Sequence, residues 1–405
     1  MKTRFSFFLL LYLLFGFSFG YSQEKSVEDL EKGLKLIQNQ WRPDWRLGVF
    51  EWSLGEMNGQ PYLNGKTTSP EAKQAVLELL KKDFPHYQVD FIIAPQENAE
   101  LNDRFYGVVT LSVINLRYDP DYSAELGTQA LLGMPVRIID KAKNSGWIRI
   151  QMPNGYLGYT TSGSVQPMTK DEYNSWISAS KIVFTDFFGF VYSEPDKDSS
   201  TISDLVAGNV LTLENSDNEL FYQVAFPDGR IGWILKESSI PFDIWLATRD
   251  LSAENVTKTA KKFLGFPYFW AGTSTKGIDC SGFVSIVFFL NRIIILRDAS
   301  QQMRDGINID VSEGYHNLKP GDLLYFGTPK SETNLGITHT GIYLGDSEFI
   351  HAATSVKINS LDPNRSDNFF QFRTSRLVKA TRLIDAPFSN SFMPVENNPF
   401  YQPVP

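Results

Sequence analysis

The sequence predicts an α+β protein of several domains: a small N-terminal α/β domain, two small all-β barrels, and a last domain in which a helix packs on an antiparallel sheet. Two observations carry this prediction. Short alternating segments with Pro-Asn-Gly or Pro-Asp-Gly turns occur twice, around 153–155 and 227–229. Farther along, a helix-length apolar run at 281–290 precedes two alternating segments at 337–344 and 348–352.

Bulk properties limit the function classes. The chain has 405 residues and a formal net charge of -8, with a pI near 5.2. At roughly 100–200 residues per domain, this length suits two to four domains. The acidic balance argues against a nucleic-acid partner. Beyond the N-terminal region no stretch is apolar enough to span a bilayer, and we expect a monomer.

The start of the chain is typical of an export signal. Two basic residues precede a nearly all-apolar segment at 5–19, close to the roughly 7–15 residues of a signal-peptide core. Small and polar residues follow, with Ser22 and Gln23 at the expected cleavage point. We therefore expect residues 1–22 to be a signal peptide and the mature protein to be exported, either periplasmic or secreted.

Residues 24–100 have the pattern of a small α/β domain. Helical apolar spacing covers 27–40, and a second helix is expected at 71–82. Strands are expected at 46–52 and 89–93. No motif in this segment carries chemistry, so we assign it a structural or positioning role.

An internal repeat predicts two barrels, at 103–168 and 178–242. The sequence MPNGYLGY at 152–159 recurs as FPDGRIGW at 226–233. Glycine readily takes positive φ, so both copies suit hairpin turns between short strands. The catalytic candidates lie after the second copy.

The last domain is expected at 253–385. The tail at 386–405 is rich in Pro, Asn and Ser, and we expect it to be flexible.

Cys280 is the one cysteine of the chain. Gly277 breaks the preceding segment, so Cys280 is expected at a helix N-terminus, where unpaired N–H groups and the helix dipole favour a thiolate and lower the thiol pKa. Ser281 and Gly282 are small enough to leave the sulfur approachable, and the backbone N–H of Cys280 suits an oxyanion. The competing interpretation is a buried structural thiol.

A thiolate needs a base. His339 and His351 lie in the two alternating segments, which a Gly-Asp-Ser turn should pair antiparallel, so both imidazoles are expected on one sheet face. This predicts Cys280 as nucleophile, His339 as base, and His351 as the group that orients it. His86 and His316 are expected to be ordinary surface residues.

Four motifs resemble those of the NlpC/P60 family of cysteine peptidases: DCSGF at 279–283, KPGDLLYF at 319–326, HTGIY at 339–343 and FIH at 349–351. The resemblance implies a papain-like catalytic domain and the triad Cys280, His339 and His351. It implies hydrolysis of peptide bonds in peptidoglycan stems. The two barrels resemble bacterial SH3-like (SH3b) domains.

The domain order also resembles the γ-D-glutamyl-L-diamino-acid endopeptidases of wall recycling, the dipeptidyl-peptidase VI group. That resemblance implies a stem-peptide substrate with a free N-terminal L-alanine, whose cationic amine requires carboxylates. The implied substrate-binding residues are Tyr268, Asp279, Ser281, Asp298, Glu125 and Tyr156. The position of Tyr156 in the first barrel is occupied by Arg230 in the second. An arginine would repel a cationic amine, so the first barrel is the one expected at the pocket. A solvated surface role for Glu125, Tyr156 and Asp298 is the alternative.

Two residues depart from the family pattern: Ala271, where glycine is usual, and Tyr159, where tryptophan is usual. Other functions stay open. The barrels could anchor a broader hydrolase to intact wall, the site could be dead in a wall-binding protein, or the fold could carry a thiol acyltransferase. No His/Cys/Asp cluster has ligand spacing, so neither a metal nor another cofactor is expected.

Overall fold

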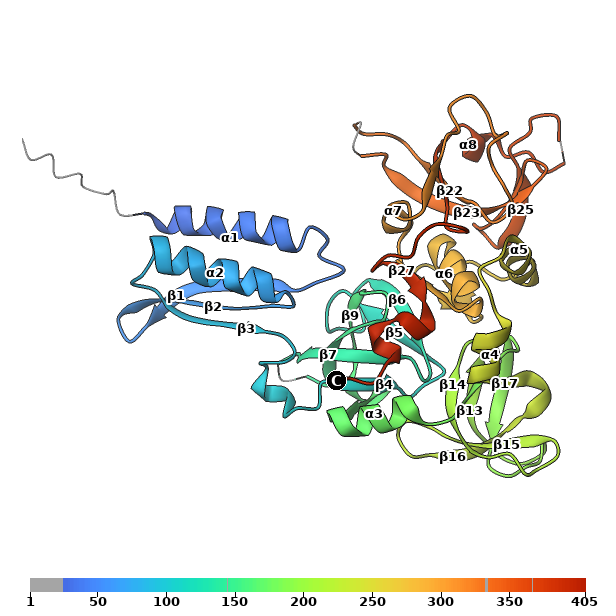
Figure 1. Ribbon diagram of the computed structural model, residues 1–405, viewed down its shortest axis with the longest axis horizontal. Coiled ribbons are helices and arrows are strands. Elements are labelled where there is room, and N and C mark those ends of the chain that lie inside the picture. The colour runs from blue at the N-terminus through green and yellow to red at the C-terminus, as the bar shows by residue number, and fades with distance from the viewer. Residues whose placement is uncertain (1–24, 144, 332–333, 366) are drawn as a thin grey trace, which may run out of the picture.

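The computed structural model describes residues 25–143, 145–331, 334–365 and 367–405. The expected signal peptide at 1–22 lies outside them. Figure 1 shows the N-terminal domain to one side, the two barrels below, and the last domain above them, with α6 facing the barrels. Within the described ranges, no helix has the length and apolarity needed to cross a membrane.

The N-terminal domain is a three-stranded sheet with two helices on one face (Figure 1). Ser69 caps the second helix by accepting a hydrogen bond from the Ala72 backbone N–H. The sheet order is β1-β2-β3, antiparallel and then parallel. The elements are α1 (Val27–Trp41), β1 (Phe50–Met57), β2 (Gln60–Thr67), α2 (Pro70–Asp83) and β3 (Gln88–Ile93).

The expected strand at 46–52 begins later than predicted. Residues 42–49 form a loop between α1 and β1, held by a hydrogen bond from Arg42 Nη2 to the Trp45 carbonyl at 2.8 Å. A second bond runs from Leu47 N to the Asp44 carbonyl at 3.1 Å. Turn formation therefore outweighs the alternating pattern here, and Arg46 lies on the loop.

The repeat forms two barrels with the same strand order. The first sheet runs β10-β4-β7-β8-β9-β5-β6, and the second runs β17-β11-β14-β15-β16-β12-β13. Gly155 and Gly229 occupy equivalent turns with φ of 82° and 87°, as the glycine-rich turns require.

Short helices flank the barrel strands. The first barrel contains η1 (Ala99–Leu101), β4 (Tyr106–Val109), β5 (Val113–Arg117), β6 (Leu126–Leu131), β7 (Pro135–Lys141), β8 (Trp147–Gln151), β9 (Leu157–Thr161), η2 (Ser162–Ser164) and β10 (Val165–Met168), and α3 (Lys170–Ser178) follows it. The second contains β11 (Lys181–Phe184), β12 (Phe188–Tyr192), β13 (Thr201–Val206), β14 (Val210–Asn215), β15 (Phe221–Ala225), β16 (Ile231–Leu235), η3 (Lys236–Ser238) and β17 (Ser239–Pro241).

The last domain packs an apolar helix on a six-stranded antiparallel sheet of order β21-β26-β22-β23-β24-β25. Phe283, Val284 and Val287 of the helix are fully buried against this sheet. Its elements are α4 (Phe242–Thr248), α5 (Ala253–Lys262), β18 (Thr273–Ser274), β19 (Gly277–Ile278), α6 (Cys280–Leu290), β20 (Ile293–Ile295), α7 (Ala299–Gln302), β21 (Ile307–Ile309), β22 (Leu323–Gly327), β23 (Ile337–Gly345), β24 (Glu348–Ala352), β25 (Val356–Ser360), α8 (Gln371–Thr374) and β26 (Leu377–Arg382). The α+β multidomain fold class is confirmed.

The C-terminal tail is not loose as expected. β27 (Phe392–Pro394) pairs antiparallel with β20, and η4 (Val395–Asn397) and η5 (Pro399–Tyr401) follow. Asn398 donates a hydrogen bond of 2.9 Å to the Pro153 carbonyl of the first barrel. The tail is therefore bonded both to the last domain, through β20, and to the first barrel, through Asn398.

Candidate active site

A cleft of about 690 Å³ lies where three domains meet. The N-terminal domain, the first barrel and the last domain all contribute side chains to it. Its walls include Arg46, Tyr118, Tyr268, Cys280, His339 and Arg373. The predicted nucleophile and base therefore face the same cleft.

Cys280 is the first residue of α6, as predicted from the sequence. Asp279 is the N-cap and accepts a hydrogen bond of 2.6 Å from the Gly282 backbone N–H. A Cβ at Gly282 would lie 2.0 Å from the Gly272 carbonyl oxygen, so only glycine allows this close approach. The residues around Cys280 thus fix the start of the helix and hold the thiol at the cleft.

The pKa of the thiol differs from expectation. Burial, and next the negative charge of Asp279, raise the pKa of Cys280 to about 11. Hydrogen bonds from the backbone amides of Thr340 and Ser281 and the charge of Arg297 act in the opposite direction without cancelling the rise. The net shift is therefore upward, opposite to the lowering predicted from the helix N-terminus, because burial is the largest effect on this thiol.

His339 and His351 meet as predicted. Their Nε2 and Nδ1 atoms are 2.6 Å apart, and both side chains are buried. His339 is on β23 and His351 on β24, with Gly341 on the same face beside them. A Cβ at Gly341 would lie 3.0 Å from the His351 Cβ, so glycine leaves the room that lets the two rings touch. Burial lowers the pKa of both, that of His351 to about 4.

A residue on a third strand continues the line of the two histidines and determines which ring nitrogens carry protons. Asn359 on β25 donates from Nδ2 to the Asn368 carbonyl at 2.9 Å, so its Oδ1 must face His351 Nε2, 2.8 Å away. His351 then carries its proton on Nε2 and accepts at Nδ1 from His339 Nε2–H. His339 is left with an unprotonated Nδ1, the state that a proton acceptor for the thiol requires.

We expect Asn359→Leu to lower kcat by on the order of tenfold or more, because His351 loses the acceptor that selects its tautomer. Asn359→Asp should retain much more activity, since a carboxylate also accepts the Nε2–H. It should also move the acid limb of the pH profile to higher pH, because a negative charge raises the pKa of His351 and, through it, of His339. The measurement is kcat/KM against pH for both variants.

A purely structural Asn359 would make different predictions. Both substitutions would then reduce activity by similar factors and leave the acid limb where it is in the wild type. Circular dichroism at each pH controls for unfolding.

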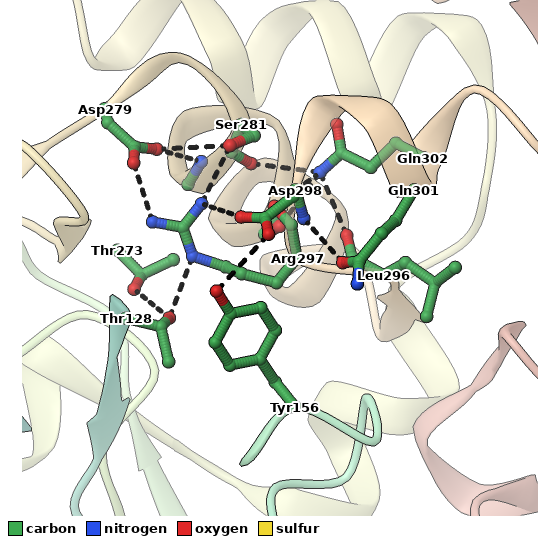
Figure 2. A network of polar contacts seen from close by, with 12 residues as sticks. Thr128, Tyr156, Thr273, Asp279, Ser281, Leu296, Arg297, Asp298, Gln301 and Gln302 are labelled. Carbon is green, nitrogen blue, oxygen red and sulfur yellow. Dashed lines mark hydrogen bonds and ion pairs between the residues drawn. The ribbon is translucent and has the colours of Figure 1, made fainter. Parts of the chain in front are cut away.

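Arg297 connects the helix start to the first barrel (Figure 2). Its guanidinium is 1% exposed in side-chain area and reaches Asp279 Oδ2, Ser281 Oγ and Thr128 Oγ1, each at 2.8 Å. Asp279 and Ser281 are thus occupied by protein partners, and a buried ion pair satisfied on both sides holds β6 against α6. Both of these predicted substrate-binding residues line the cleft.

Asp298 lines the cleft, and Tyr156 is bonded to it. The Tyr156 hydroxyl donates to Asp298 Oδ2 at 3.3 Å (Figure 2). The Tyr118 hydroxyl is 2.9 Å from that of Tyr156. Tyr156 is fully buried. Burial, and next the charge of Asp298, raise the pKa of Tyr156, so the phenol stays a donor.

The other predicted residues are less closely grouped. Tyr268 lines the cleft beside Cys280, whereas Glu125 is exposed, its backbone carbonyl accepting from Tyr118 N.

Ala271 has φ of 61°, a left-handed conformation that explains why glycine is usual there. Tyr159 lies 5.4 Å beneath the Arg149 guanidinium. His86 and His316 are exposed.

Sequence reasoning missed several cleft or relay residues, among them Arg46, Asn359 and Arg373. The N-terminal domain was given no chemistry, yet Arg46 lines the cleft and forms an ion pair of 2.6 Å with Asp298. Asn359 follows in the strand after His351, and an amide at that alternating position was the available signal. Arg373 lies on α8 with no motif around it.

Two family models match parts of the chain. Residues 265–376 match the NlpC/P60 family, and residues 116–164 match the bacterial dipeptidyl-peptidase Sh3 domain. The N-terminal domain lies outside both matches. Dipeptidyl-peptidase 6 of Lysinibacillus sphaericus is 34% identical over 264 residues, which are 63% of this chain and 91% of that protein.

A γ-D-glutamyl-L-lysine dipeptidyl-peptidase of Bacillus cereus is 25% identical, over 61% of this chain and 73% of that protein. Among solved structures, an NlpC/P60 family protein from Bacillus cereus aligns with a TM-score of 0.58 at 23% identity, covering 68% of this chain and 99% of that one, which shows the fold. With a relative so similar over nearly its whole length, and with both family models matched in order, the chain belongs to the NlpC/P60 family of cysteine peptidases.

Proposed function

We propose that this protein is a cysteine peptidase that hydrolyses the bond between γ-D-glutamate and the following diamino acid in peptidoglycan stem peptides that carry a free N-terminal L-alanine. It acts on wall fragments during turnover, outside the cytoplasm after export. The observation that carries the proposal is the cleft, in which Cys280 and His339 lie beside the carboxylate of Asp298. That carboxylate suits the substrate amine.

The proposed chemistry uses the histidine row. His339 Nδ1 takes the proton of Cys280 as the sulfur attacks the γ-carbonyl carbon of D-glutamate. The resulting oxyanion is stabilised by the backbone N–H of Cys280. His339 then returns the proton to the amine of the diamino acid, which leaves, and a water activated by the same imidazole releases the thioester as a carboxylic acid. Burial lowers the pKa of both histidines, so the pair is neutral before the sulfur attacks and His339 is free to accept the proton.

Two relatives support the substrate assignment by their names. One is a dipeptidyl-peptidase, and the other is named for the γ-D-glutamyl-L-lysine bond. A dipeptidyl-peptidase releases two residues from a free amino terminus, so its cleft must end two residues before the scissile bond. In this chain Asp298 and the side chains around it are the candidates for that end.

The main alternative is a broader hydrolase of intact wall with the barrels as anchors. One observation disfavours it. Tyr118, Leu126 and Gly127 of the first barrel line the cleft itself, and Arg297 is bonded to Thr128 of that barrel. A barrel held in the cleft wall suits a role in substrate selection better than one in tethering.

We expect Asp298→Asn to lower kcat/KM on L-Ala-γ-D-Glu-diaminopimelate by roughly 30-fold, because losing one partner of a desolvated ammonium–carboxylate contact costs about 2–5 kcal/mol. Glu125→Gln should have a smaller effect, since Glu125 is exposed and its charge is better screened. Mass spectrometry of products from the free and N-acetylated tripeptides measures both effects.

The decisive comparison is a two-by-two cycle of enzyme and substrate. Acetylation should impair the wild type severely and Asp298→Asn less, because the positive charge that acetylation removes has already lost its partner in the variant. If the two losses simply multiply, Asp298 does not bind the amine. If the wild type cleaves both peptides equally, the proposed exopeptidase is wrong and the broader hydrolase replaces it.

A further inference from the structure

The loop at 42–49 of the N-terminal domain is fixed in place by the first barrel. Leu157 N donates to the Arg46 carbonyl at 2.8 Å, and Gln151 Nε2 donates to the Leu47 carbonyl at 3.0 Å. Trp45 meets Tyr118 edge to face, with ring centroids 4.9 Å apart. Arg46 is therefore held in the cleft wall by main-chain hydrogen bonds and does not reach it merely as a long surface side chain.

The Arg46 guanidinium lies between two carboxylates. Nε and Nη2 pair with Asp44 at 2.8 Å each, and Nη1 pairs with Asp298 Oδ2 at 2.6 Å. Gln301 of α7 secures Asp44 from the other side with a hydrogen bond of 3.0 Å. The Arg46 side chain remains 19% exposed. The positive charge of Arg46 is thus balanced within the protein, although part of its side chain still faces solvent.

The two oxygens of Asp298 have different surroundings. Oδ2 accepts from Arg46 and from Tyr156. The nearest ion-pair partner of Oδ1 in the described part of the chain is Arg297 Nη1, at 3.9 Å. Asp298 is also the N-cap of α7, where its side chain faces the Gln301 backbone N–H in a capping box. Because a carboxylate offers about four acceptor sites, Oδ1 keeps the capacity to accept a hydrogen bond from a ligand, while Oδ2 holds the carboxylate in one orientation.

We infer that Arg46 is a specificity-determining residue that closes the end of the cleft, orienting Asp298 toward a substrate ammonium and excluding peptides extended or acylated at that nitrogen. The inference rests on the proposed function. A substrate ammonium can be bound by Oδ1 of Asp298 and occupies little volume beside Arg46. An acyl group brings a carbonyl and further atoms into the volume beside Arg46, and it offers no positive charge to Asp298. The N-terminal domain would then contribute directly to exopeptidase specificity.

A merely structural interdomain contact would act differently. If Arg46 only held the loop against α7, its loss would change the kcat/KM of every substrate by the same factor. Arg304 supplies the matched control, because it also contacts Asp44, at 3.5 Å, but is 51% exposed in side-chain area and lies outside the cleft lining. Arg304→Ala should leave the ratio between substrates unchanged.

The experiment measures kcat/KM for the full chain on L-Ala-γ-D-Glu-diaminopimelate, its N-acetyl form, and the same peptide with one glycine added before alanine. In Arg46→Ala we expect the free-amine peptide to lose a few-fold and both extended peptides to gain, so that the preference for the free amine falls by about tenfold or more. Arg46→Gln, which keeps the volume and a donor toward Asp298, should fall between wild type and alanine and covers the case in which alanine disturbs folding.

The outcomes separate the two proposals. A wild type that prefers the free amine together with an Arg46→Ala variant whose preference is within twofold of it would overturn the role of Arg46 and leave the proposed function standing. A wild type without any preference would overturn both. A loss of preference in Arg304→Ala as large as in Arg46→Ala would reduce Arg46 to a structural contact.

Discussion

Cys280→Ala is expected to abolish hydrolysis, with a loss on the order of 10⁴–10⁶-fold, because no other group can form the thioester. Cys280 is the single cysteine of the chain. Alanine fits the first position of α6, and the Asp279 N-cap bond goes to the Gly282 backbone, so the fold should persist. The measurement is product formation from the free-amine tripeptide at high enzyme concentration.

Thiol labelling supplies the control. Iodoacetamide should modify the wild-type protein at Cys280 with concomitant loss of activity, and it should leave the alanine variant unmodified. Because the pKa of Cys280 is raised to about 11, the labelling rate of the free protein should still be rising above pH 8. A variant that keeps more than about a tenth of wild-type activity would contradict the assignment of the nucleophile.

His339→Ala should be nearly as damaging, since the neutral thiol depends on an adjacent base to lose its proton. His351→Asn should be milder. Its role is to orient His339 through one hydrogen bond, and an amide can partly replace that bond. Activity and thermal unfolding of both variants are the readouts, with the exposed His316→Ala as a control expected to behave as wild type.

Two outcomes would contradict the roles assigned to these histidines. Normal activity in His339→Ala would refute the base. Complete loss in a well-folded His351→Asn, equal to that of His339→Ala, would show that His351 does more than orient its neighbour.

The sequence predicted the parts of the site that depend on local signals. Local residues mark the start of a helix, which placed Cys280 at its N-terminus. Alternation on both sides of a tight turn marks a pair of strands, which placed His339 and His351 on one sheet face. The barrels were predictable because a repeated turn sequence requires the same glycine conformation twice. These are short-range constraints on the backbone.

Contacts between distant segments could not be predicted in the same way. Arg46 and Asp298 are separated by 252 positions, and nothing in the residues around Arg46 indicates the carboxylate that it meets. The sign of the Cys280 pKa shift was missed for a related reason. The helix N-terminus is a local property that favours the thiolate, whereas burial, the stronger effect here, depends on the whole fold.

The docked tail joins the two domains that form most of the cleft. β27 completes a small sheet with β20 beside α6, and Asn398 bonds to the first barrel. Val404 N donates in turn to Asn174 Oδ1 at 2.7 Å. Because the catalytic domain and the first barrel both line the cleft, deleting residues 392–405 would test the cleft as well as the tail. A tail that braces this junction makes substrate selection depend on residues that never touch the substrate.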